Sequence, residues 1–205
     1  MIAQLLPSKN HRLSFVFSIA LLIMLASCQK SETATAPSKR PKIDACGLIS
    51  NEEVQDIQGS PITNTKGSEN SDGTFRTAQC FYNAETFNKS VSLAVTQADP
   101  ESAKARNPKD FWKETFGRYE GEAKKEAGDE EKKKSLGEQD EEKGRPPKKI
   151  EGIGEAAYWT ANRVGGALYV FKDDVFIRIS VGGLDSEEAK INNCKALAEK
   201  ALSHL

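Results

Sequence analysis

Few residues of this chain belong to the types that usually perform catalysis. The two histidines of the sequence are His11, in a leader-like segment, and His204, next to the last residue. A Ser-His-Asp or Cys-His site would have to use His204, at a chain end that frays readily. Zinc held by cysteine and histidine is disfavoured on the same ground. We therefore expect no catalytic residue and no metal ligand of these kinds.

Three other patterns in the sequence bear on chemistry. The chain has 30 aspartates and glutamates, so a hydrolase that uses carboxylates alone stays open as an alternative. Asn70-Ser71-Asp72-Gly73 lacks the later ligands of a calcium loop, which favours a plain turn. The pattern Gly152-x-Gly154-x-x-Ala157 matches a dinucleotide fingerprint, but it leads into the β-prone pair Tyr158-Trp159 instead of opening a helix. We expect no cofactor.

The strongest chemical signal is Cys28. It follows Lys9, Arg12 and the apolar run Leu13–Ser27, which together have the layout of a signal peptide. The run has about 15 residues, whereas a membrane-spanning helix needs roughly 20. Leu25-Ala26-Ser27-Cys28 resembles the lipobox of bacterial lipoproteins. The resemblance implies a signal peptide over residues 1–27 and lipidation of Cys28. The alternative is cleavage elsewhere, or retention of the run as an anchor.

Lipidation would fix the location of the protein. Several acyl chains on Cys28 hold a protein at a membrane far more firmly than a single chain does. We expect a lipid-anchored protein of the cell envelope. Because Gln29 and not aspartate follows Cys28, the resemblance favours the outer membrane, on its periplasmic or surface face, in a Gram-negative organism. Otherwise it implies the outer face of the plasma membrane. Residues 28–42, rich in Ser, Thr, Ala, Pro and Lys, predict a flexible tether.

Charge excludes one class of partner. Lys plus Arg is 29 against 30 for Asp plus Glu, so no net field attracts nucleic acid. The most charged segment, at about 120–149, has too few apolar residues to order itself and predicts a disordered, mobile insertion. A docking arm for a charged partner is the alternative interpretation of this segment.

The rest of the chain, residues 43–205, predicts a single α+β domain in which helices flank an antiparallel sheet. A capping box of Ser50 and Glu53 starts a helix over about 51–58, and Asn107-Pro108 starts a second. Asp185 and Glu188 resemble a capping box for a terminal helix that runs to about Leu205. Residues 63–73 read as turns. Strands are expected at Thr74–Tyr82, Ser90–Gln97, Glu155–Thr160, Ala167–Phe171 and Val175–Val181, the last two joined as a hairpin.

With Cys28 lipidated, three cysteines remain and three single pairings are open. They are Cys46, Cys80 and Cys194. Cys194 shares an apolar stripe with Ile191 and Ala198, which predicts a small buried side chain. A reactive thiol at Cys194 is the alternative, and it lacks a neighbouring base.

Two stretches resemble a family of secreted lipoproteins of unknown function that is well represented in actinobacteria. The first combines Asp44, Cys46, Leu48-Ile49-Ser50, Glu53-Val54 and Gly59, and the second is Gly152–Trp159. In that family the first cysteine pairs with one that stands two residues before an aromatic. The resemblance therefore implies a Cys46–Cys80 disulfide, since Tyr82 follows. It also implies a fold similar to the α/β/α sandwiches of the PsbP type. This chain departs from the family at Ala45, where proline is usual, and in its charged insertion.

Aromatic side chains offer a place for a ligand. A pocket for a small apolar ligand could be lined by Tyr158, Trp159, Tyr169, Phe111 and Trp112. The alternative is that these side chains only pack in the core. We expect a non-enzymatic envelope domain that binds a partner protein or a small ligand. A carrier of lipid or other apolar molecules is a further alternative, beside the carboxylate hydrolase.

Overall fold

A computed structural model describes residues 41–120, 145–162, 165–183 and 186–205. The expected signal peptide, Cys28, nearly all of the tether and most of the charged insertion lie outside the described residues. Within the described ranges, no helix is long and apolar enough to cross a bilayer.

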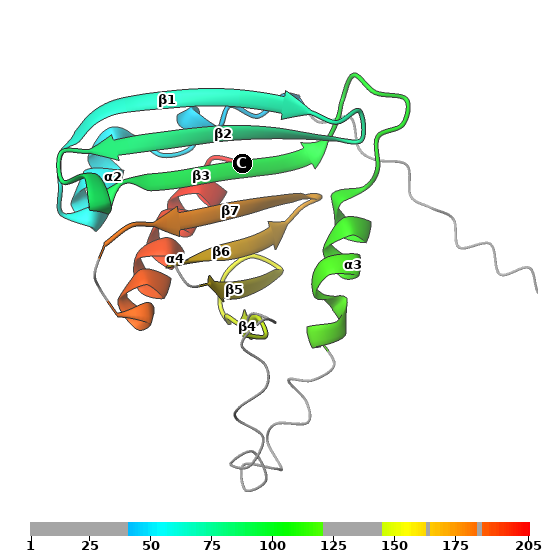
Figure 1. Cartoon of the computed structure of the whole chain (residues 1–205). Helices are drawn as coiled ribbons and strands as arrows, with labels where there is room; N and C mark the ends of the chain where they lie inside the picture. The colour runs from blue at the N-terminus through cyan, green and yellow to red at the C-terminus, as the bar shows by residue number, and fades with distance from the viewer. Residues whose placement is uncertain (1–40, 121–144, 163–164, 184–185) are drawn as a thin grey trace, which may run out of the picture. The chain divides into compact units, whose positions relative to one another are not determined.

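The strands of the described residues form one seven-stranded sheet, in which every neighbouring pair of strands is antiparallel. Its spatial order is β1-β2-β3-β7-β6-β5-β4. Strands β3 and β7 are therefore neighbours near the centre of the sheet, although a helix (Pro108–Glu120) and three strands separate them in sequence (Figure 1). The strands are β1 (Ile62–Ser71), β2 (Phe75–Ala84), β3 (Val91–Ala98), β4 (Lys148–Lys149), β5 (Ala156–Asn162), β6 (Gly165–Lys172) and β7 (Val175–Val181).

One face of the sheet forms the main core with helices α2 (Asn51–Gln58) and α4 (Glu187–Ser203). Along β3 and β7 every second side chain enters this core, as the two-residue period of a strand requires. The expected capping box of α2 is present: Ser50 Oγ accepts from the Glu53 N–H, and Glu53 accepts from the Ser50 N–H. Gly59, in the left-handed conformation at φ 63°, ends the helix.

The start of the domain is fastened to this core by a disulfide. Cys46, in the short 3-10 helix η1 (Ala45–Gly47), is bonded to Cys80 of β2, with Cα atoms 5.0 Å apart. The pairing that the family resemblance implied is thereby confirmed. A second 3-10 helix, η2 (Phe87–Lys89), joins β2 to β3.

On the other face of the sheet lies helix α3 (Pro108–Glu120), beside β5–β7 in Figure 1. Asn107 Oδ1 accepts from the Lys109 N–H at 2.8 Å, as expected of a residue that caps a helix beginning with proline. Trp112 and Phe116 are buried, and with Tyr158 and Phe171 they form a second, smaller cluster. The predicted α+β architecture, an antiparallel sheet flanked by helices, is confirmed.

Two local predictions were wrong. Residues 63–73, read as turns, belong almost entirely to the edge strand β1, whose side chains are nearly all exposed. Backbone pairing with β2 holds this strand, so it shows no apolar alternation. The terminal helix is capped by Ser186, whose Oγ accepts from the Ala189 N–H at 3.2 Å, and not by Asp185, which lies outside the described residues.

Candidate functional site

A groove of about 300 Å³ opens between α3 and the sheet. It lies on the face opposite the main core, next to the aromatic cluster that fixes α3. The described residues that line it are Phe111, Trp112, Thr115, Phe116, Arg118, Tyr119, Pro147, Thr160, Tyr169 and Phe176.

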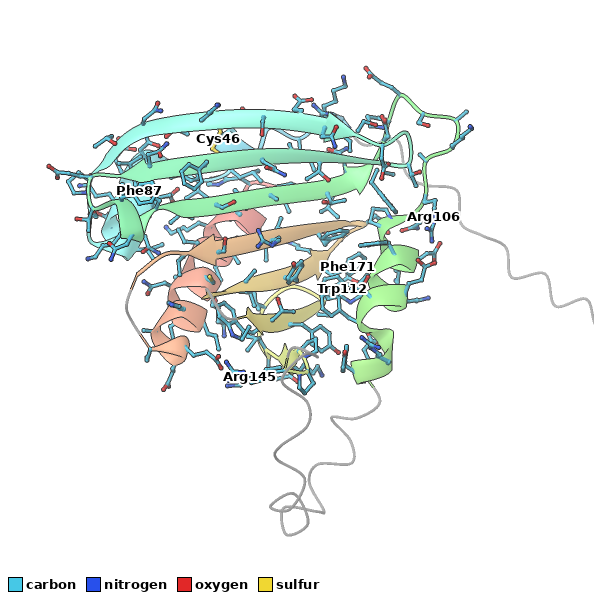
Figure 2. All side chains as sticks on the ribbon, viewed as in Figure 1. Cys46, Phe87, Arg106, Trp112, Arg145 and Phe171 are labelled. Carbon is cyan, nitrogen blue, oxygen red and sulfur yellow. A yellow bond between two sulfur atoms is a disulfide. The ribbon has the colours of Figure 1, made fainter. Side chains whose placement is uncertain are left out.

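The helix supplies one wall of the groove. Phe111, Thr115 and Arg118 follow one another at spacings of four and three residues, which places them on one side of α3. Trp112 is only 3% exposed and anchors the helix on the sheet. Figure 2 shows Trp112 of α3 beside Phe171 of β6, where the ring centroids are 5.5 Å apart. The wall therefore rests on a rigid contact.

The sheet supplies the floor. Strand register places Tyr169 between Tyr158 of β5 and Arg178 of β7. Thr160 and Phe176 point to the same face, because they alternate with side chains of the main core. Neighbouring strands thus bring together residues that are distant in sequence.

Ring stacking gives the groove its aromatic character. Phe116 lies parallel to Tyr158, with centroids 4.9 Å apart and an interplanar angle of 2°. Phe111 stacks on Phe176 at 5.7 Å and 16°. Such pairs add stability beyond their buried area, so the groove is preformed by the packing of the protein itself.

Two buried polar groups belong to the same cluster. Trp112 Nε1 and the Tyr158 hydroxyl have no hydrogen-bond partner within the described part of the chain, although most buried polar groups are paired. Burial, with a further contribution from the charge of Glu120, raises the pKa of Tyr158. Its hydroxyl is therefore protonated at neutral pH and is a potential donor.

The structure brings together four of the five predicted pocket aromatics. Phe111, Trp112 and Tyr169 line the groove, and Tyr158 lies behind it, in contact with Trp112 and Phe116. Trp159 belongs to the main core on the opposite face of the sheet, because adjacent residues of a strand point in opposite directions. It cannot contact a ligand in the groove.

The remaining lining residues were not predicted from the sequence to belong to a pocket. They include Phe116, Phe176, Tyr119 and Thr160. The helical spacing of Phe116 and Tyr119 from Phe111 and Trp112 was a usable signal. The alternation of Phe176 with Val175 and Ile177 was a second one. Neither pattern tells which helix covers which strand.

Asp72, in the turn Asn70-Ser71-Asp72-Gly73, and Asp99, which follows β3, both accept hydrogen bonds from nearby groups of the chain. Asp72 Oδ1 accepts from the N–H groups of Thr74 and Phe75, both at 2.7 Å, and these bonds lower its pKa. The hydroxyl of Ser71 and the Glu101 N–H lower the pKa of Asp99. Lowered values suit permanently ionised carboxylates, not a general acid at neutral pH. No group of three or more potential metal ligands occurs in the described ranges.

Cys194 lies in the main core on α4, fully buried. Its thiol donates to the Ile179 carbonyl at 3.5 Å, and burial raises its pKa to about 12. A thiol with this pKa is protonated at neutral pH and is a poor nucleophile.

Comparisons with known proteins add little. No protein-family model matches the chain, and no curated protein is significantly similar to it. The resemblance to secreted lipoproteins therefore stays a prediction. Among solved structures, the chain is similar to a GTP binding regulator from Thermotoga maritima, at 9% identity and a TM-score of 0.37, over 80% of this chain and 93% of that one. A similarity this weak carries no conclusion about function.

Proposed function

We propose that this chain is a lipid-anchored protein of the bacterial cell envelope whose α+β domain binds a small apolar ligand in the groove between α3 and the sheet. The observation that carries the binding role is the aromatic groove itself. Ligand sites are concave, mostly apolar, and fitted with a few polar groups that orient the ligand. The groove has an apolar majority, and its polar side chains include those of Thr115, Thr160, Tyr169 and Arg118.

The size of the groove restricts the ligand. Its volume of about 300 Å³ stands at the lower end of the range of small-molecule sites, roughly 300 to 1,000 Å³. This suits a compact body such as two aromatic rings or a short acyl chain. It does not suit the complete acyl region of a membrane lipid, so the domain acts as a binding protein for small molecules.

Binding can be tested with the fluorescent dye N-phenyl-1-naphthylamine, an uncharged molecule of two ring systems. We expect its fluorescence to rise on binding and the emission of Trp112 to be quenched. The second tryptophan, Trp159, lies on the other face of the sheet, so the quenching should persist in a Trp159→Phe variant.

A groove-filling variant locates the binding. Thr115→Trp places a large ring over the groove, and we expect it to weaken dye binding at least tenfold, about 1.4 kcal/mol. Thr63→Trp, on the exposed edge strand β1, is the matched control and should leave the affinity unchanged. Equal affinity of the dye for both variants would contradict binding in the groove.

The anchor is tested separately. We expect the wild-type protein, expressed with its leader in a Gram-negative host, to fractionate with membranes, and Cys28→Ser to release it or leave an unprocessed precursor, because the acyl chains supply the membrane affinity. Mass spectrometry should find the lipid mass on the fragment that begins at residue 28. Membrane attachment that persists in Cys28→Ser would refute the anchor, whatever the groove binds.

A further inference from the structure

We propose that the ligand of the groove is an amphiphilic anion, with an apolar body against the aromatic wall and an acidic group held by Arg178. This inference rests on the proposed function, because it specifies what kind of molecule occupies the same groove. The observation that carries it is the position of Arg178, which lies beside the groove in contact with Tyr169 and has no carboxylate partner among the described residues.

Arg178 lies in the middle of β7 and points to the α3 face of the sheet. Its neighbours in the strand, Ile177 and Ile179, enter the main core, so Arg178 shares the opposite face with Phe176 of the groove. Arg178 Nε donates to the Tyr169 hydroxyl at 3.2 Å, and its guanidinium carbon lies 5.9 Å from the centre of the Tyr169 ring. Because Tyr169 lines the groove, the cation stands at its edge.

Within the part of the chain that the structure describes, the charge of Arg178 is not balanced by an ion pair. Three other arginines each have an acidic partner, in Arg76–Glu69, Arg106–Glu114 and Arg145–Glu187. No carboxylate in the described ranges lies within 4 Å of Arg178. One N–H of its guanidinium is used by Tyr169, which leaves the two terminal nitrogens for a ligand.

The lining of the groove also carries positive charge, like Arg178. Among the described residues that line it, Arg118 is the one charged member and none is acidic. Burial and the charges of Glu120 and Glu151 raise the pKa of Tyr158, so these two acids lie near the aromatic cluster. They lie at its β4–β5 end, together with Lys149. An anionic group is therefore favoured at the Arg178 end of the groove, and an apolar one in its body.

Small side chains leave Arg178 accessible. Ala94 stands directly across from it on β3, and the next pair on the same face is Ser92 with Ser180. Ala94, Ser92 and Ser180 are only partly buried, so a carboxylate or sulfonate can approach the guanidinium over the open sheet. The two hydroxyls are available as further donors. Arginine binds such planar or forked anions with paired hydrogen bonds.

The test compares two dyes that share both ring systems. One is the neutral N-phenyl-1-naphthylamine, and the other, 8-anilinonaphthalene-1-sulfonate, adds a sulfonate. We expect Arg178→Gln to weaken binding of the sulfonate at least tenfold and to change binding of the neutral dye less than twofold, as loss of a charge-assisted bond predicts. Arg178→Lys should retain part of the affinity. Arg145→Gln, on an exposed arginine, is the control and should change neither.

The outcomes separate this inference from the proposed function. If both dyes bind and Thr115→Trp weakens both, but Arg178→Gln leaves the sulfonate unchanged, the anion site is refuted and the groove remains. If neither dye responds to Thr115→Trp, the binding role fails as well. If sedimentation shows a dimer that the dyes dissociate, a second copy occupies the groove and the inference is overturned. A folded Arg178→Gln protein, checked by its melting curve, is required for each comparison.

Discussion

Replacing Cys46 and Cys80 together by alanine should lower the free energy of unfolding by about 4 kcal/mol, the loss that the chain-entropy model gives for a cross-link of this span. The two cysteines are 34 residues apart, so the bond removes much freedom from the unfolded chain. It also ties η1, at the very start of the domain, to β2 in the main core. For a domain of this size the melting temperature should fall by about 10 °C.

Urea unfolding of the oxidised wild type and the double variant measures this loss. Dithiothreitol should destabilise the wild type by a similar amount and leave the double variant unchanged, which controls for packing at the two sites. A loss below about 1 kcal/mol would mean that the unfolded chain keeps the two segments close without the bond.

Trp112→Ala should release α3 from the sheet while the main core stays folded. Removing a buried tryptophan costs about 3–5 kcal/mol. Trp112 is the centre of the second cluster, with ring contacts to Phe116, Phe171 and Tyr158. None of these residues belongs to the cluster that α2 and α4 cover. The damage should therefore be local.

Hydrogen exchange distinguishes local from global loss. Amides of α3 should lose their protection in Trp112→Ala, whereas those of β3 and β7 should keep most of theirs, and dye binding in the groove should disappear. Phe87→Ala removes an aromatic side chain that is 77% exposed, and it should change stability by less than about 0.5 kcal/mol. Equal loss of protection in all strands would show that the two clusters form one cooperative unit.

The strands in which apolar and polar residues alternate could be predicted from the sequence. In β7 the core residues Val175, Ile177 and Ile179 are every second one, and the expected limits of that strand agree with the structure. The hairpin before it was predicted from Lys172-Asp173-Asp174. The structure has Asp173 and Asp174 at φ 50° and 64°, the left-handed values that a tight two-residue hairpin turn needs.

Strand β1 could not be predicted in the same way. Its residues are almost all polar and exposed, and a strand at the edge of a sheet is held through its backbone to one neighbour only. Charged residues such as Lys66 and Glu69 are typical of such edges, where they discourage pairing with other chains. These features look like a loop when they are read along the chain.

The groove was half visible in the sequence. Aromatic content drew attention to Phe111, Trp112 and Tyr169, but the alternation of a strand could already have excluded Trp159 once Tyr158 was placed. Arg178 gave no signal, since one arginine between two isoleucines reads as the solvent face of a strand. Its place beside Tyr169 follows from the pairing of β6 with β7 and from the helix that covers only part of that face.

Binding in the groove is tested most directly by nuclear magnetic resonance on the isotope-labelled domain, titrated with N-phenyl-1-naphthylamine. We expect the largest amide shifts at Thr115, Thr160 and Phe176, which line the groove, and none at Ala198 in the core of α4. Absence of shifts at saturating dye, or shifts centred on the exposed Phe87 instead, would contradict the proposal.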